Sequence, residues 1–393
     1  MLAQGNQKVD IFALNNPNSG FFSGGDMVLQ SENTIGGDAH YWARGNFRIE
    51  QLNGKLGNLF SPYNPVIRAS GDVSFDSYEG ASLHILAGGS VNISGDVTIN
   101  GVDTSNFIKE PVTLSDGETL DIDGSKEPTL DIRAGVNSNN IGTPGFTPNL
   151  PIGFNGPNLN TTKEPTNANI TLNGNIYNTS GDESNSGQIL ITSQYNPNKL
   201  PGNITTGEIL TYGDVTVNSR GDITTNGAID TITAHSGENN KEGGNIRLLA
   251  NQNILISGNL LSSFYSEINT DNNDSGYAGS IIINAPGQIS ILNGSKIKSE
   301  GNFGYININA DSLYLDPASE INTDNSSGYS GYIRINASKQ ISILNGSKIS
   351  SNGNFGYINI KTDSLYLDPA SEINTDNSSG YSGYIRINAS KQI

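Results

Sequence analysis

The chain of 393 residues contains 47 glycines and is 34% hydrophobic and 15% charged, which is too rich in turn formers for a helical protein and too apolar and periodic for a disordered one. Its formal net charge of −17 and the lack of a visible basic stripe argue against nucleic acid as a partner. The chain has no cysteine and no apolar run near the ~18–20 residues of a membrane-spanning helix, so neither disulfides nor a transmembrane segment is expected.

Residues 1–135 are predicted to form the amino-terminal coils of a solenoid. The opening MLAQGNQK, residues 1–8, has neither the basic start nor the apolar core of a signal peptide. Gly-Asp pairs at residues 71–72 and 95–96 each precede a strand with alternating apolar residues. The interval from the first pair to the second predicts the length of one coil.

Residues 136–168 interrupt this pattern with a stretch rich in proline, glycine and asparagine. Proline cannot donate a hydrogen bond within a central strand, so we expect a long excursion loop here. Five apolar residues are expected to dock the loop against a face of the solenoid: Phe146, Leu150, Ile152, Phe154 and Leu159. A ligand-binding loop is the alternative.

Residues 169–393 are predicted to resume the coils. Gly244 to Leu248 reads like Gly331 to Ile335, but the next matching glycine after Gly244 is Gly279. The interval between these two glycines is about one strand and one turn too long for a coil. We expect the extra residues, around Leu260 to Phe264, to bulge out.

The last third of the chain repeats itself. The segment that begins at Ser266 returns at Ser319 and Ser371, which gives double-coil repeats of roughly 52–53 residues. Each repeat splits into two related halves, so that four tyrosines follow at nearly equal steps: Tyr305, Tyr332, Tyr357 and Tyr384. A period of roughly 26 residues with almost no helix signal is typical of a solenoid.

One half-repeat predicts the structure of the coil. Ile306 and Ile308, Leu313 and Leu315, and then Ile321 are apolar at alternate positions, which indicates three short strands with one buried face each. Turn formers separate these strands at residues 310–312, 316–318 and 322–331. Coils of about 24–27 residues, stacked about 4.8 Å apart, would place equivalent apolar side chains on one another. The fold class is therefore all-β, a parallel β-helix.

The alternation also predicts which side chains face inward. Ile333 is expected inside the coil and Arg334, the next residue, outside it. A fully buried isoleucine stabilises a fold by roughly 1.5–3 kcal/mol, so these inward positions supply the main cohesive contribution.

Some parallel β-helices are polysaccharide lyases or hydrolases, which place carboxylates on one exposed face as acid, base or nucleophile. Candidates that could line up across coils are Asp214 with Asp222, and Asp121 with Asp123 and Asp131. Aspartate in Gly-Asp-Val or Leu-Asp-Ile contexts is more typical of a turn or an outward strand position. We therefore predict no catalytic site.

Metal binding is also weakly supported. The three histidines, His40, His84 and His235, lie far apart in the sequence, and His84 is expected at a solvated strand position. Residues 270–276 alternate aspartate, asparagine, serine and glycine as in a calcium loop, but the twelfth position from Asp271 is an isoleucine where calcium needs an acid. An asparagine and serine turn is the preferred interpretation, without metal or cofactor.

Two kinds of side-chain row are expected along the repeats. Three asparagines at one corner are predicted to stack as an amide ladder: Asn269, Asn322 and Asn374. An aromatic row is predicted from Tyr277, Tyr329 and Tyr381, followed by Tyr332 and Tyr384. Packing between coils is the preferred role of this row, and binding of sugar faces is the alternative.

The stretch FFSGGDMVLQSENTIGGDAHYWARGNFRIE, residues 21–50, and the Gly-Asp-led strands after it resemble the body of large cyanobacterial filamentous haemagglutinin-like exoproteins of the two-partner secretion type. The most distinctive part is residues 36–50, and the pattern of Gly-Asp-led strands and coils rich in asparagine and glycine continues over nearly the whole chain. The resemblance implies a long right-handed β-helix at the cell surface or released from it. It also implies that the full-length protein has a signal peptide, a secretion domain and an outer-membrane barrel transporter as partner.

The chain is accordingly expected to be a non-enzymatic segment of a secreted or surface-exposed exoprotein, extracellular or on the outer membrane, which adheres to glycans or cells or projects another part. A carbohydrate-active β-helix enzyme is the alternative, and an incomplete gene fragment without function is a third possibility. The sequence stops at residues 390–393, in the middle of a predicted strand, so a piece of a longer protein is expected.

Overall fold

The computed structural model describes residues 2–5, 9–12, 20–38, 40–63, 65–102, 109–141, 164–180, 187–231, 233–234, 243–265, 277–323, 325, 329, 331–376, 381 and 383–392. Apart from one short helix, the described elements are β-strands, and nearly all of them pair in parallel. The fold is a parallel β-helix, as the repeat predicts. Two compact units divide the chain: unit 1 is residues 1–207 with 218–220, and unit 2 is residues 208–217 with 221–393.

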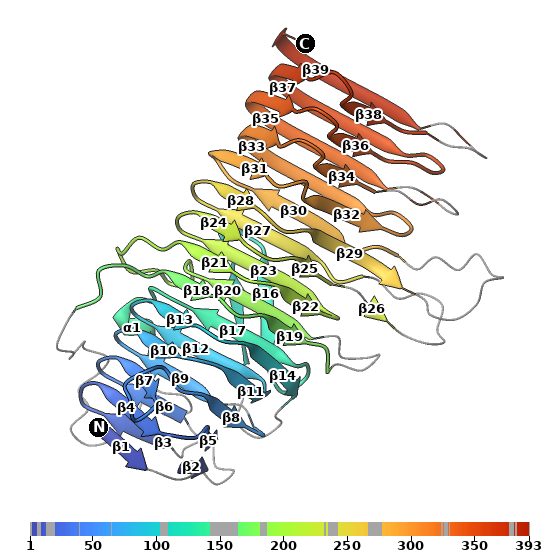
Figure 1. Cartoon of the computed structure of the whole chain (residues 1–393). Coiled ribbons are helices and arrows are strands. Elements are labelled where there is room, and N and C mark those ends of the chain that lie inside the picture. Colours follow the sequence, from blue (N-terminus) through green and yellow to red (C-terminus); the bar gives the residue numbers. More distant parts are fainter. Residues whose placement is uncertain are drawn as a thin grey trace. The chain divides into compact units, whose positions relative to one another are not determined.

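In unit 1, each coil contributes one strand to each of three faces, as Figure 1 shows. Face 1 contains β3 (Gly20–Ser23), β6 (His40–Ala43), β9 (Val66–Ala69), β12 (Leu83–Ala87), β17 (Thr129–Arg133) and β20 (Gln188–Thr192). Face 2 contains β1 (Leu2–Gly5), β4 (Met27–Ser31), β7 (Phe47–Glu50), β10 (Val73–Phe75), β13 (Val91–Ile93), β18 (Ile170–Leu172) and β21 (Ile204–Thr206). Face 3 contains β2 (Val9–Phe12), β5 (Ile35–Asp38), β8 (Leu59–Ser61), β11 (Tyr78–Ala81), β14 (Val97–Gly101) and β19 (Ile176–Asn178).

Two insertions leave the coils of unit 1. The hairpin of β15 (Lys109–Thr113) and β16 (Thr119–Asp123) lies between β14 and β17. The second insertion connects β17 to β18 and begins with α1 (Ser138–Ile141). It contains the predicted excursion, of which residues 142–163, with the five expected docking residues, lie outside the described part of the chain. No helix in the described ranges has the length and apolar character to cross a bilayer.

Unit 2 by itself has the same three-faced arrangement. Face 1 contains β23 (Asp214–Ser219), whose last two residues belong to unit 1, β27 (Ile246–Ala250) and β30 (Ser280–Asn284). Face 2 contains β24 (Ile223–Thr225), β28 (Ile254–Ile256) and β31 (Gln288–Ile291). Face 3 contains β22 (Ile209–Thr211), β25 (Ile229–Asp230), β29 (Leu260–Tyr265), β32 (Lys296–Glu300), β34 (Glu320–Asn322), β36 (Lys348–Ser350) and β38 (Glu372–Asn374), and β26 (Thr233–Ala234) pairs with β29.

In the last coils one long strand runs through faces 1 and 2. These strands are β33 (Tyr305–Leu315), β35 (Tyr332–Ile343), β37 (Tyr357–Leu367) and β39 (Tyr384–Gln392). The turn expected at residues 310–312 is therefore wrong: the register shifts at this point, and a β-bulge bends the strand without ending it.

Side chains that face inward form ladders of equivalent residues, which make up the core of each unit. In unit 1, Ile67, Ile85, Ile132 and Ile191 pair in successive coils, and all four are fully buried. In unit 2, Ile333 is fully buried and its neighbour Arg334 is exposed, which confirms the predicted strand phase. Because each apolar side chain stacks on its own equivalent, strands of three to five residues can bury a continuous core.

Two expectations about coil length are wrong. Val73 pairs with Val91 on face 2, whereas Val97 belongs to face 3 and pairs with Tyr78. The interval between the two Gly-Asp pairs thus includes an extra face, because the same turn opens strands on different faces.

Residues 260–265 do not bulge out: they form β29, in which Leu260 is fully buried and pairs with Ile297.

Candidate functional site

The densest group of buried charges in the described part of unit 1 lies on the outer side of face 1, beneath the hairpin of β15 and β16. The hairpin is amphipathic, and three of its apolar residues are buried: Val112, Leu114 and Ile122. At its turn, Ser115 Oγ donates a hydrogen bond to Asn218 Oδ1 at 2.7 Å. The insertion thus covers outward-facing positions of the coils that would otherwise meet water.

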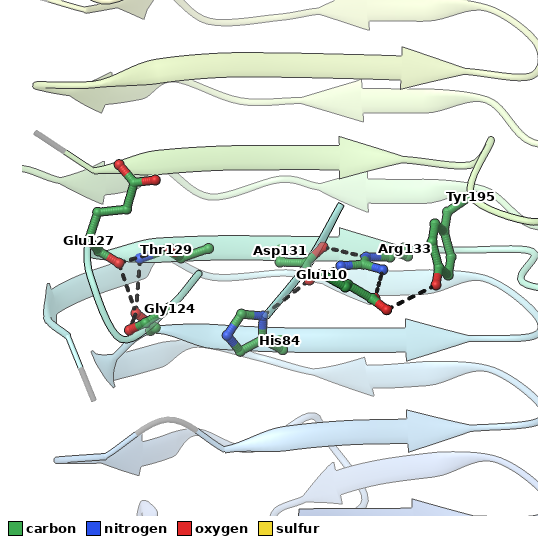
Figure 2. Close-up of polar contacts among 9 residues, drawn as sticks. His84, Glu110, Gly124, Glu127, Thr129, Asp131, Arg133 and Tyr195 are labelled. Carbon is green, nitrogen blue, oxygen red and sulfur yellow. Dashed lines mark hydrogen bonds and ion pairs between the residues drawn. The ribbon is translucent and has the colours of Figure 1, made fainter. Parts of the chain in front are cut away.

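Figure 2 shows the network under this cover. His84 on β12 and Asp131 on β17 are register partners in adjacent coils, and His84 Nδ1 lies 3.1 Å from Asp131 Oδ2. Arg133, two residues further along β17, donates from Nε and Nη2 to the two carboxylate oxygens of Asp131, each at 2.8 Å. All three side chains are fully buried.

The hairpin joins the network through one carboxylate. Arg133 Nη1 forms an ion pair with Glu110 of β15. The Tyr195 hydroxyl donates to the other oxygen of Glu110 at 3.3 Å, and the Tyr195 ring lies 4.3 Å from the Arg133 guanidinium carbon in a cation–π arrangement. A second guanidinium, on Arg68 of β9, donates to the carbonyl of Ile141 at the end of α1.

Electrostatics favour the ionised form of this network. Burial would raise the pKa of Asp131, but the charge of Arg133 and hydrogen bonds from His84 and Arg133 outweigh burial and lower it. Burial opposes the charge on Arg133, yet Asp131 and Glu110 raise its pKa above the ordinary value. For Arg68, burial dominates and lowers the pKa to about 10. Burial, with the charge of Glu110, raises the pKa of Tyr195.

His84 was expected at a solvated position, and this expectation is wrong. The side chain does point outward from β12, but the residues that lead from β16 to β17 cover it. The backbone of Gly124 approaches so closely that a Cβ there would lie 2.6 Å from His84 Nε2, and this nitrogen is buried without a hydrogen-bond partner. Ser82 Oγ holds this segment in place, since it donates to the Gly124 carbonyl at 3.1 Å and accepts from the Thr129 amide at 3.0 Å.

The network is suited to holding the hairpin on the coils. A histidine, a carboxylate and an arginine are also the parts of a general acid–base site, but a substrate must reach a proton-transferring atom to within hydrogen-bond distance. Here His84, Asp131 and Arg133 have no exposed surface. The arrangement therefore fixes the hairpin to the coils through charges that would be costly to leave unpaired.

The predicted carboxylate groups do not assemble into one site. Asp121 and Asp123 belong to the antiparallel hairpin, where Asp123 forms an ion pair with Lys109 at 3.1 Å, whereas Asp131 lies on face 1. In unit 2, the backbone amide of Asn245 donates to Asp214 Oδ1 at 2.7 Å, and the amide of Asn253 donates to Asp222 Oδ1 at 2.9 Å. Asp214 thus begins β23 and Asp222 lies just before β24, and each carboxylate connects its coil to the next.

Comparisons with protein-family models, curated proteins and solved structures found no match.

Metal binding finds no support among the described residues, which contain no group of three or more acidic or histidine side chains arranged to hold an ion. Of the candidates, His40 is buried on β6. His235 and residues 270–276 lie outside the described part of the chain.

The amide ladder forms at other asparagines than those predicted. Asn322 and Asn374 are not adjacent, because Ser350 lies between them in register, and Asn269 is outside the described residues. Instead, Asn309 Nδ2 donates to Asn284 Oδ1 at 2.7 Å, and Asn336 Nδ2 donates to Asn309 Oδ1 at 2.8 Å. These asparagines lie on the outer side of face 1, where a polar ladder remains accessible.

Unit 2 carries two aromatic ladders where one row was predicted. The five rings of the outer ladder stack with centroids 4.9–6.0 Å apart: Tyr277, Phe303, Tyr329, Phe355 and Tyr381. The tyrosine ladder on face 1 stacks with centroids 4.7–5.6 Å apart and contains Tyr305, Tyr332, Tyr357 and Tyr384. The preferred prediction, packing between coils, is confirmed.

The prediction missed the two phenylalanines of the outer ladder, although a signal for them exists. The members of that ladder follow one another at a constant interval in the sequence. Phe303 and Phe355 each follow an asparagine and have a positive φ, of 58° and 62°. All five side chains are exposed, by between 40% and 71%.

Proposed function

We propose that this chain is a non-enzymatic segment of a secreted or surface-exposed exoprotein and that unit 2 displays a repeated surface for adhesion. The outer aromatic ladder is the observation that supports this function best. Soluble proteins rarely expose large contiguous apolar patches without an interaction to make. Here five rings form one continuous strip, one ring per coil.

The geometry of the ladder favours contact along its length. The three inner rings, Phe303, Tyr329 and Phe355, are each stacked on both faces, so along the ladder the exposed surface consists mainly of ring edges and tyrosine hydroxyls. Edges and hydroxyls suit contact with an extended surface better than stacking on one sugar ring. The resemblance to filamentous haemagglutinin-like exoproteins supports the same role, with a transporter barrel as the partner of the full-length protein.

A carbohydrate-active enzyme is less well supported. Among the described residues, the candidate carboxylates Asp123, Asp131, Asp214 and Asp222 all bind neighbouring side chains or backbone amides that hold coils or the hairpin together. An acid pair on one open face, which glycoside cleavage requires, has no support from these contacts.

The proposal is tested by coating beads with the full chain and counting beads retained on cell layers under flow. Phe303→Asn with Phe355→Asn removes two rings, and asparagine tolerates the positive φ at both positions. We expect retention to fall severalfold in this variant. The matched control is Phe60→Thr with Tyr63→Asn, which removes two exposed aromatic side chains of unit 1. Failure of the unmodified chain to retain beads, or equal retention by both variants, would contradict the proposed role.

A further inference from the structure

A groove follows successive coils on the outer side of unit 2, at the bend of the long strands. It has a volume of about 730 Å³ and is lined by residues of β33, β35, β37 and β39. At its base, small residues occupy the bulge of each coil in register: Ala310, Ala337, Thr362 and Ala389. One wall of the groove is the outward side of face 1, which carries Asn309, Arg334 and Asn336.

The groove lining carries the cations Arg334 and Lys361 and the carboxylate Asp363. Asp363 is paired with Lys391, so the charge left unpaired is positive, in contrast to the acidic chain as a whole. Arg386 lies two coils beyond Arg334 in the same register column, with Asn359 between them. All three cations are exposed, and none of them has an ion pair among the described residues.

Two nearby lysines, in contrast to these three cations, are neutralised by ion pairs. Lys339 and Lys391 also lie near the bend, but each forms an ion pair with an aspartate at 2.6 Å, Asp311 and Asp363 respectively. The charges left available are therefore Arg334, Lys361 and Arg386, one in each of three successive coils. Coils are about 4.8 Å apart, so the positive charges advance along the axis by about this distance per coil.

We propose that this groove binds a linear acidic polysaccharide along the axis of unit 2. One carboxylate per sugar residue matches one cation per coil, and an arginine guanidinium binds a carboxylate with two parallel hydrogen bonds. The amides of Asn309, Asn336 and Asn388 line the same groove and provide donors and acceptors for sugar hydroxyls.

Other polyanions fit this surface less well. Nucleic acid requires a strongly basic protein surface, which a chain with a net charge of −17 does not provide. An acidic peptide would leave the ladder of side-chain amides with few hydroxyl partners. The inference rests on the proposed adhesive function and names its ligand class.

The test is titration calorimetry of the full chain with oligomeric polygalacturonate, at low and at high ionic strength. We expect binding that weakens with salt and that Arg334→Gln with Lys361→Gln reduces about tenfold, because two charge-assisted contacts are lost. The matched control, Lys296→Gln with Lys348→Gln, removes two charges from face 3 and should bind as the unmodified chain does. Circular dichroism verifies that both variants fold.

Several outcomes would overturn the inference. These are equal binding of neutral dextran, tighter binding of polyglutamate or single-stranded DNA than of polygalacturonate, or equal loss in both double variants. The bead experiment separates this inference from the proposed function. Beads retained on cells without polygalacturonate binding would refute the groove alone, whereas polygalacturonate binding without retention would refute adhesion alone.

Discussion

At the scale of single residues, Ile333 and Arg334 lie on opposite sides of β35 and test the strand phase. Ile333→Asp would place an unpaired carboxylate in the core, and we expect it to lower the free energy of unfolding by about 4 kcal/mol or more. Arg334→Asp should change it by less than about 0.5 kcal/mol, because the side chain is exposed. Chemical denaturation measures both values, and similar losses would refute this phase.

Asp131 offers a second test at this scale. Asp131→Asn leaves the buried guanidinium of Arg133 with Glu110 as its remaining carboxylate, and we expect a loss of about 3–5 kcal/mol in the free energy of unfolding. The exposed Asp121→Asn is the control, with an expected change below about 0.5 kcal/mol.

The Asp131 contribution should depend on pH in one direction. Its folded-state pKa is lowered, so the stabilisation is complete above the unfolded pKa of about 3.9 and disappears as the pH falls through the lower folded-state value. The difference between the unmodified chain and Asp131→Asn should therefore be constant near neutral pH and shrink in acid below about pH 4. A difference that grows on acidification would contradict the ionised network.

At the scale of elements, the hairpin of β15 and β16 is held to the coils by the Glu110 carboxylate, the hydrogen bond from Ser115 to Asn218 and a small apolar face. Glu110→Gln removes the charge that contacts Arg133. We expect amide hydrogen exchange in the hairpin to become about tenfold faster, with unit 2 unchanged. Glu118→Gln, in the hairpin turn, is the matched control. Unchanged exchange after Glu110→Gln would show that the charge of Glu110 does not hold the hairpin.

The same elements show how far the sequence could predict the structure. Strand existence and phase follow from local alternation, as Ile333 and Arg334 illustrate. The place of Asp214 at the boundary between a turn and β23 also follows from its local Gly-Asp context. The environment of His84 does not, because its burial depends on an inserted hairpin that returns over face 1, and such a return has no periodic signal.

The candidate sites also include features that the repeat predicts and contacts that only the fold creates. The repeated tyrosines predict an aromatic row. The ladder also contains Phe303 and Phe355, which a pattern restricted to tyrosine does not include. Arg133, Glu110 and Tyr195 come together from β17, the hairpin and the segment after β20. Only the fold brings these three residues into contact.

At the scale of the whole molecule, a solenoid consists of repeats that contact only their neighbours. Residues 319–370 form one double-coil repeat, and joining Ala318 to Ser371 recreates the native junction between Ala370 and Ser371. The strands before and after the deleted segment are equivalent, so the core ladders of β33 and β39 should meet in register. In a protein with one shared core, loss of a segment this long would instead prevent folding.

This deletion is the most direct test of the coil organisation on which the displayed surfaces depend. Circular dichroism and thermal unfolding of the deleted chain should show the same β-sheet content per residue and a cooperative transition within a few degrees of the unmodified chain. The outer aromatic ladder would keep its period while losing two rings. An aggregated or unfolded product would contradict the stacked-coil organisation.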